Sequence, residues 1–394
     1  MAQDAYVWQR AWTDPVREAV RQQGGRFGSV VVLAAEVTWT PAGPKPVRVD
    51  VDYEELRRLG RPVGIALRIG AYRGAFDEDD QTARWLADLA ASLWTRAVEA
   101  GVEIGEIQLD FDCPESKLAG YARWVRAIRS RHPPAPVTIT ALPCWLDRRA
   151  FRELAGQVNH YVLQVHSFQR PRGPDGPFTL CDPAAARRAV EQAGRIGAPF
   201  RVALPTYSYL AAFDPDGGFV GVSAEGPAQS WPEGAILRTV EADPAAMAAL
   251  VRGWTRDRPA AMTGVIWYRL PTRADRMNWP WPTLEAVMAG RTPAPSLQAF
   301  ATRGESGTVQ IELANVGDAA SCGRVTVEVR YRGTLEASDA LGGFQRVDDA
   351  PGRMVFSRSE GPAGRLGPGR RMLIGWIRLG SDTEVSAHVI PADP

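Results

Sequence analysis

Val- and Ile-rich runs alternate with amphipathic stretches along the first 290 residues, and this alternation restricts the fold more than any other feature of the sequence. Eight runs have the length and composition of strands: residues 27–37, 63–69, 106–112, 137–142, 160–166, 200–205, 236–241 and 264–269. Helical patterns follow six of them, at residues 80–99, 116–130, 147–156, 183–196, 244–255 and 282–289. Strands that alternate with helices in this way predict a parallel sheet with crossover connections.

Eight such units in residues 1–290 predict an α/β fold of the (β/α)8 TIM-barrel type, whose usual length is about 250 residues. Two helix starts carry suitable capping chemistry, because Asp182 and Asp243 each precede a proline at the first helical position. A doubly wound sheet is the alternative. It would require a glycine-rich phosphate loop, and neither GxGxxG nor GxxxxGK[ST] occurs.

The composition changes after residue 290. Residues 291–296 read RTPAPS and indicate a linker. Beyond it the apolar period is mostly two, in short runs at residues 307–313, 324–331, 352–356, 371–378 and 384–390. We therefore expect residues 297–394 to form a β-sandwich accessory domain, and the LANVGDA stretch at residues 313–319 resembles immunoglobulin- or fibronectin-like domains.

Charge and hydropathy exclude several classes of partner. The net charge is +1 and no Lys/Arg run occurs, so we expect no nucleic acid partner. No apolar stretch is long enough to span a bilayer. The start, Met-Ala-Gln-Asp, resembles a mature terminus behind an added Met, so we expect an exported protein (periplasmic, lipoprotein or secreted), with a cytoplasmic location as the alternative.

The four cysteines form no CxxC pair, which argues against zinc-ribbon and thioredoxin-like sites. Cys113 and Cys144 follow two successive predicted strands, so a disulfide between them is geometrically feasible, and the state of Cys181 is open. Cys322 is expected to be a small buried residue.

The most informative local stretch is IQLDFDCPES, at residues 107–116. Side chains alternate along a strand, so Asp110 and Asp112 share one face while Ile107, Leu109 and Phe111 share the other. Carboxylates that point into a protein are unfavourable unless they are paired, hydrogen-bonded or hydrated. The two aspartates therefore either brace loops or form an active site at the carboxyl end of a strand.

Other polar and aromatic side chains fall at or just beyond the ends of predicted strands. They are Glu36, Arg68, Gln164, His166, Tyr207, Glu241, Trp267 and Arg269, with Trp39 and Trp145 in nearby loops. In a TIM barrel the carboxyl ends of all strands meet at one face, where active sites lie. Taken singly, each residue has a structural explanation, but together they have the composition of a sugar-binding cleft.

Glycoside hydrolysis usually needs two carboxyl groups, one to protonate the leaving oxygen and one to act as nucleophile or to activate water. We expect Asp112 to be the reactive group and Asp110, deeper on the strand, to hold a proton or orient it. Glu36 or Glu241 could supply a second carboxyl group from across the barrel mouth. Arg68, Gln164, His166, Tyr207, Trp267, Arg269, Trp39 and Trp145 are the candidate substrate-binding residues.

Three stretches resemble an uncharacterised bacterial family known only as a domain of unknown function. They are LDFDCPESKLAGYARWVRAIR at residues 109–129, VTITALPCWL at 137–146 and YVLQVHSFQRP at 161–171, and the resemblance covers most of residues 5–290. The family is grouped with TIM-barrel glycosidases. The resemblance therefore implies a glycosidase-like barrel, but it supplies no substrate and no catalytic residues.

The DxD of Asp110 and Asp112 is also similar to part of the chitinase-like signature DxxDxDxE. Position 107 is Ile instead of the first Asp, and Pro114 occupies the place of the acidic Glu. Glu115 comes one residue later and reads as a helix N-terminal residue favoured by the dipole. The signature belongs to a fourth barrel strand, whereas this strand is the third by count.

Three functions remain open. The first is a glycoside hydrolase or related carbohydrate-active enzyme that acts on a polysaccharide or oligosaccharide without a cofactor. The second is a barrel that binds glycans without cleaving them. The third is a metal-dependent hydrolase in which Asp110, Asp112 and His166 are ligands. The sequence carries no information about protein partners.

Overall fold

The computed structural model describes residues 1–76, 81–131, 136–167, 173–176, 179–224, 229–304, 307–359, 365–380 and 384–390. The chain divides into two compact units, Met1–Trp279 and Pro280–Pro394. The first unit contains the candidate site.

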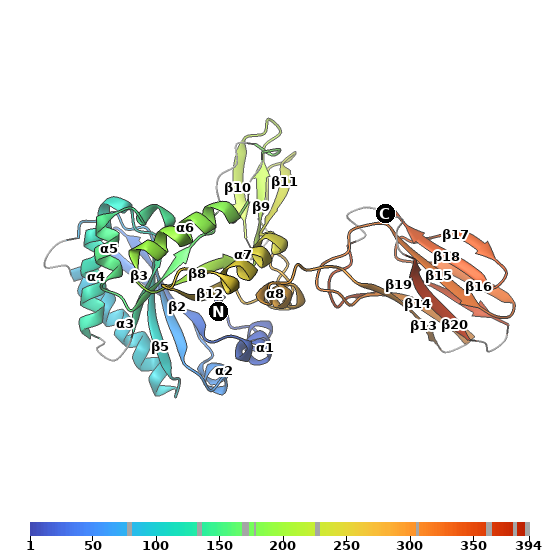
Figure 1. Cartoon of the computed structure of the whole chain (residues 1–394), viewed down its shortest axis with the longest axis horizontal. Coiled ribbons are helices and arrows are strands. Elements are labelled where there is room, and N and C mark those ends of the chain that lie inside the picture. Colours follow the sequence, from blue (N-terminus) through green and yellow to red (C-terminus); the bar gives the residue numbers. More distant parts are fainter. Residues whose placement is uncertain are drawn as a thin grey trace. The chain divides into compact units, whose positions relative to one another are not determined.

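A closed barrel of eight parallel strands forms the centre of the first unit (Figure 1). Its strands are β1 (Ala2–Val7), β2 (Val30–Thr40), β4 (Val63–Ile69), β5 (Ile104–Phe111), β6 (Val137–Ala141), β7 (His160–Gln164), β8 (Phe200–Pro205) and β12 (Met262–Tyr268). The barrel closes because β1 pairs with β12 on one side and with β2 on the other. The predicted TIM-barrel architecture is confirmed.

Helices follow the barrel strands as expected for crossover connections (Figure 1). They are α1 (Asp14–Gln23), α2 (Tyr53–Arg58), α3 (Gln81–Glu99), α4 (Leu118–Arg131), α5 (Arg149–Ala155), α6 (Pro183–Ile196) and α7 (Pro244–Arg256). Asp182 Oδ1 accepts hydrogen bonds from Ala184 N and Ala185 N at 2.8 and 3.1 Å, and Asp243 caps α7 in the same way. The two predicted helix caps are therefore confirmed.

Two strand assignments from the sequence need correction. The first barrel strand is β1, whose sequence AQDAYV lacks the Val/Ile richness used to find the others. The predicted seventh barrel strand, residues 236–241, is instead β11 (Ile236–Glu241). It belongs to a separate antiparallel sheet with β9 (Ser208–Phe213) and β10 (Phe219–Ser223), inserted between β8 and α7 (Figure 1). Strand β5 is consequently the fourth barrel strand, not the third.

The strand register determines which side chains share the barrel interior. Arg68 on β4 pairs with Glu36 on β2 and with Asp110 on β5. Four residues before Arg68 on β4, Gly64 pairs with Glu106, and a Cβ at Gly64 would lie 2.9 Å from Glu106 Cγ. Glycine is therefore needed at residue 64 to leave room for a carboxylate inside the barrel.

An additional strand, β3 (Gly43–Arg48), runs antiparallel to β2 and extends the barrel sheet at this position. Short 3-10 turns, η1 (Gly24–Arg26), η2 (Glu115–Lys117) and η3 (Pro143–Trp145), complete the first unit.

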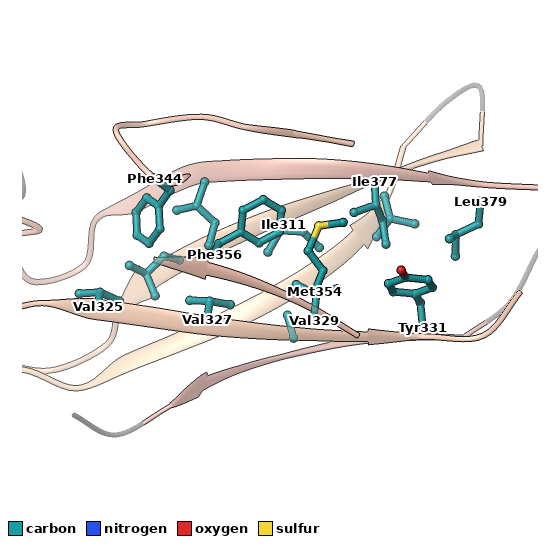
Figure 2. Close-up of a cluster of buried hydrophobic side chains, with 14 of the residues drawn as sticks. Ile311, Val325, Val327, Val329, Tyr331, Phe344, Met354, Phe356, Ile377 and Leu379 are labelled. Carbon is teal, nitrogen blue, oxygen red and sulfur yellow. The ribbon is translucent and has the colours of Figure 1, made fainter. Parts of the chain in front are cut away.

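The second unit contains α8 (Trp281–Met288) and two four-stranded antiparallel sheets. One sheet has the order β13 (Leu297–Arg303), β14 (Thr308–Asn315), β19 (Arg371–Leu379), β16 (Leu335–Ala340). The other has the order β17 (Gln345–Ala350), β18 (Arg353–Arg358), β15 (Val325–Tyr331), β20 (Val385–Ile390). Figure 2 shows their shared core, in which Ile311 and Ile377 lie with Val327 and Phe356.

Among the described residues, no helix has the length and hydropathy required to cross a membrane. All four cysteines are free, so the Cys113–Cys144 disulfide is not formed. Cys322 is exposed, and the expectation that it is buried is wrong.

Candidate active site

A cavity of about 280 Å³ lies at the carboxyl ends of the barrel strands. Its described lining comes from seven of the eight barrel strands and the segments that follow them: Tyr6, Trp8, Arg68, Asp110, Asp112, Thr140, Gln164, His166, Ser167, Ala203, Tyr207, Tyr209 and Tyr268. Six predicted residues meet here, namely Asp110, Asp112, Arg68, Gln164, His166 and Tyr207. This is the face at which TIM-barrel enzymes carry their active sites.

Asp110 is the less exposed of the two carboxyl groups of this cavity. Its Oδ1 accepts a hydrogen bond from Thr140 Oγ1 at 2.9 Å, and Arg68 Nε lies 3.9 Å from Oδ2. Burial raises its pKa, the negative charge of Asp112 raises it further, and Thr140 and Arg68 only partly oppose them, so the pKa is about 6. Asp110 can therefore hold or release a proton near neutral pH, as an acid–base catalyst requires.

Asp112 follows the last residue of β5 and is exposed to solvent. It lines the same cavity as Asp110. Asp112 is therefore the carboxylate of the pair that is more accessible to a ligand, as the sequence predicted.

Glu36 forms ion pairs with Arg10 and Arg68. Its carboxylate accepts hydrogen bonds from Arg10 Nε and Nη2 at 2.5 and 3.0 Å, and from Arg68 Nη1 at 3.3 Å. Burial would raise the pKa of Glu36, but the bonds and charges of Arg10 and Arg68 outweigh it and hold the pKa below its usual value. Glu36 is not in the described lining of the cavity, and its geometry suits it to hold the two arginines.

Aromatic rings form one wall of the cavity. Tyr268 is the centre of this wall, with ring centroids 5.8 Å from Tyr6, 5.6 Å from Trp8 and 5.5 Å from Tyr207. Tyr209 follows at 5.1 Å from Tyr207. Rings of this kind offer apolar faces with polar edges, which suits the faces and hydroxyls of a sugar.

His166 connects this wall to the polar side. Its Nδ1 lies 3.1 Å from the Tyr207 hydroxyl, and burial lowers the pKa of His166 to about 4. The imidazole is therefore neutral at physiological pH, so it acts as a hydrogen-bonding group rather than a cation. A further cavity of about 820 Å³ shares His166, Gln164 and Ser167 with the first, so the space continues beyond the histidine.

Several predicted site residues lie elsewhere. Trp145 and Trp267 are fully buried: Trp145 packs on Phe151, and Trp267 donates its Nε1–H to Gln3 at 2.9 Å. Trp39 donates to the Gly70 carbonyl at 2.8 Å and packs on Tyr72. None of these three tryptophans is in the described lining of the cavity.

Glu241 is exposed on β11, outside the barrel sheet and outside the described lining. Its assignment rested on β11 being a barrel strand, and that premise is wrong. Arg269 is an intermediate case, because it lines an adjoining cavity while Asp275 accepts a hydrogen bond from its Nη2 at 2.9 Å.

The sequence interpretation missed Tyr6, Trp8, Thr140 and Tyr268. Tyr6 and Trp8 belong to the unrecognised first strand and the segment after it. Tyr268 alternates with Trp267 along β12, but alternation does not say which face is inward. The signal that could have located Thr140 is the VTITA strand, in which Thr138 and Thr140 share one face.

A second group of charges lies deeper in the barrel, and its carboxylates and its arginine are buried. Arg201 donates to Asp4 at 2.9 Å and to both oxygens of Glu106 at 2.6 and 2.8 Å. Thr138 donates to Glu106 at 2.7 Å, and His160 Nε2 lies 3.1 Å from the same carboxylate. Burial would raise the pKa of Glu106, but Arg201 and His160 hold it far below its usual value. We call Asp4, Glu106, Thr138, His160 and Arg201 the barrel floor.

Among the described residues, no group of three or more His, Cys, Asp and Glu side chains is arranged to hold a metal ion. Asp110, Asp112 and His166 line one cavity but do not form such a group, so the geometry does not support the metal-dependent alternative.

The fold and the cavity together define a (β/α)8 barrel with a pair of carboxyl groups at the end of its fourth strand. The chain belongs to the family described as a domain of unknown function, DUF3142, whose model matches residues 59–273, more than half of the chain. A search of curated proteins found no match.

Solved structures of similar fold include two bacterial enzymes. The spore cortex-lytic enzyme SleL from Bacillus cereus has a TM-score of 0.52 at 12% identity, covering 73% of this chain and 74% of that one. A chitinase from Chromobacterium violaceum has a TM-score of 0.51 at 11% identity, covering 74% and 98%. At this identity the likeness shows the fold alone.

Proposed function

We propose that the protein is a carbohydrate-active enzyme that hydrolyses glycosidic bonds of a polysaccharide or oligosaccharide in the barrel-mouth cavity. The observation that carries the proposal is the pair Asp110 and Asp112 in one aromatic-walled cavity, with the pKa of Asp110 raised to about 6. The chitinase and the cortex-lytic enzyme of similar fold are consistent with a glycan substrate.

In this proposal the two carboxyl groups divide the work. Asp110 holds a proton near neutral pH, and Asp112, nearer to solvent, contacts the glycosidic oxygen or the attacking water. The proton passes from the pair to the leaving oxygen as the bond from that oxygen to the anomeric carbon breaks. Water then adds to the anomeric carbon and returns a proton to the pair.

Glycan binding without cleavage is the second candidate, and one observation favours it. Pro114 occupies the place of the acidic Glu in the chitinase-like signature, and Arg148 Nε binds the neighbouring Glu115 at 2.5 Å. Glu115 is therefore engaged in an ion pair and does not line the described cavity.

The test separates binding from cleavage. Oligosaccharide binding is followed by tryptophan fluorescence, because Trp8 lines the cavity, and cleavage by release of reducing ends. Asp112→Asn should lower turnover by about 10²–10⁴-fold, the usual contribution of an acid–base group, while binding and melting temperature change little. Asp88→Asn, an exposed aspartate paired with Arg131 on the helical surface, is the matched control.

Full turnover by Asp112→Asn would remove the assigned role of Asp112. Binding without any release of reducing ends by the natural protein would support the second candidate instead.

We infer that the protein acts outside the cytoplasm, where bacterial polysaccharides are exposed, and cell fractionation tests this. We also propose that the two-sheet second unit is an immunoglobulin-like accessory domain. The two four-stranded antiparallel sheets around one core support this.

A further inference from the structure

A cavity of about 210 Å³ adjoins the candidate active site. Its described lining consists of Trp8, Arg10, Arg68, Tyr207, Ser208, Tyr209, Ala224, Tyr268, Arg269 and Met277. Five of these residues also line the cavity of Asp110 and Asp112, namely Trp8, Arg68, Tyr207, Tyr209 and Tyr268. The two cavities therefore form one groove with a shared aromatic wall.

The two ends of this groove differ in charge. The described lining of one end holds Asp110 and Asp112, and that of the other holds Arg10 and Arg269 without any carboxylate. Arg68 lines both ends. We call Arg10, Arg68 and Arg269 the arginine end.

Carboxylates outside this lining hold the three guanidinium groups in place. Glu36 binds both Arg10 and Arg68, and Asp275 binds Arg269. Arg68 Nε also lies 3.9 Å from Asp110 Oδ2, so each of the three guanidinium groups has a carboxylate partner among the described residues.

The Arg269 guanidinium is held by a small network. Asp275 Oδ1 accepts from Arg269 Nη2 at 2.9 Å, while its Oδ2 accepts from Thr272 N and Asn278 Nδ2 at 2.9 and 3.2 Å. Arg10 uses Nε and Nη2 for Glu36, and a guanidinium carries five N–H donors in a planar fork. Donors remain for a ligand, and arginine forks match the planar oxygens of carboxylates and the oxygens of sulfates.

We propose that the arginine end binds an anionic substituent of the glycan, a carboxylate or a sulfate, so that the substrate class is an acidic glycan. This inference rests on the proposed function and adds the chemistry of its substrate. The charge difference along the groove also orients the chain, because Asp110 and Asp112 repel the anionic group while the arginine end attracts it.

The test compares ligands that differ only in charge. Oligogalacturonates are matched with their fully methyl-esterified forms, and dextran sulfate oligomers with dextran of the same length. Binding to the full chain is measured by calorimetry at low and at high salt. One acidic probe should bind at least about tenfold more tightly than its neutral partner, and the preference should shrink at high salt.

Two variants locate the effect. Arg10→Gln and Arg269→Gln should each remove most of the preference for the acidic probe. Arg149→Gln, an exposed arginine paired with Glu153 on α5, should keep it. Arg10 is itself largely exposed, so its variant tests the proposal even if Arg269→Gln, which leaves Asp275 buried without its partner, fails to fold.

The outcomes separate this inference from the proposed function. Equal affinity for acidic and neutral members of both pairs, or an acidic preference that survives in Arg10→Gln, overturns the inference. Binding of neutral oligosaccharides only, such as chitin or cellulose tetramers, overturns the inference and leaves the proposed function standing. If no glycan of either class binds, both fail.

Discussion

Strand β5 carries two carboxyl groups inside the same barrel, and their environments are opposite. Glu106, in the barrel floor, contacts Arg201, His160 and Thr138, which hold its pKa far below the usual value. Asp110 lies four residues later, at the mouth. It accepts one hydrogen bond from Thr140, Arg68 Nε lies 3.9 Å from its Oδ2, and its pKa is raised to about 6.

These environments show which of the two carboxylates stabilises the fold and which is available for chemistry. A buried carboxylate whose pKa is lowered is satisfied by its partners and contributes to stability at neutral pH. A carboxylate whose pKa is raised in the folded state lowers stability when it is ionised, and such groups concentrate at functional sites. The floor therefore supports the barrel, and the mouth carries the pair that we propose to be reactive.

The largest expected effect comes from removing the cation of the floor. Arg201→Met would leave Asp4 and Glu106 buried without the arginine that they share, at a cost of about 3–5 kcal/mol. The mouth counterpart Arg68→Met should cost about 1 kcal/mol or less, because Arg68 is partly exposed. Urea unfolding measures both, and equal costs would remove the distinction between floor and mouth.

A second pair of variants on β5 should change stability in opposite directions at pH 7. Asp110→Asn should stabilise the fold by up to about 3 kcal/mol, because ionised Asp110 is disfavoured by burial and by Asp112. Glu106→Gln should destabilise it, since the lowered pKa of Glu106 contributes stability above its unfolded pKa.

The stabilisation by Asp110→Asn should depend on pH, because only ionised Asp110 destabilises the fold. The folded pKa of Asp110 lies above its unfolded value, so the penalty is absent below about pH 4, grows as the pH rises and is complete above about pH 6. The gain in thermal stability over the natural protein should therefore vanish in acid. A destabilised Asp110→Asn at pH 7 would contradict the assignment.

Particular residues show how far the sequence could predict this site. The alternation of Asp110 with Phe111 placed the aspartates on one face, and strand order then brought Arg68, Gln164 and His166 to the same mouth. Glu241 was assigned wrongly because an antiparallel side strand has the same apolar pattern as a barrel strand. The packing of Trp39 and the burial of Trp145 and Trp267 could not be deduced either, since tryptophan serves packing and ligand contact equally well.

The edge strands of the second unit illustrate a related limit. β16 and β17 have the sequences LEASDA and QRVDDA, which lack a buried apolar face strong enough to mark a strand. Both lie at sheet edges, where neighbouring strands rather than side-chain hydrophobicity hold the backbone. The inner strands β15 and β19 have clear alternation and were predicted.

The smallest expected effect concerns the threonines of β6. Thr140→Val removes the hydrogen bond that favours ionised Asp110, so the pKa of Asp110 should rise further, by roughly one unit. If hydrolysis needs protonated Asp110, the alkaline limb of the pH–rate profile should move up by the same amount. Thr138→Val is the matched control, because Thr138 donates to Glu106 in the floor. It should lower stability without moving the profile, and identical shifts in both variants would show that the mouth is not special.

Carboxyl ¹³C titration by NMR measures the raised pKa of Asp110 itself, and the Asp110→Asn variant assigns its signal. We expect one aspartate signal with an apparent pKa near 6 that is absent from Asp110→Asn and moves to lower pH in Asp112→Asn. If every aspartate titrates below about pH 4.5, Asp110 is an ordinary ionised carboxylate, and the reactive pair at the barrel mouth does not exist.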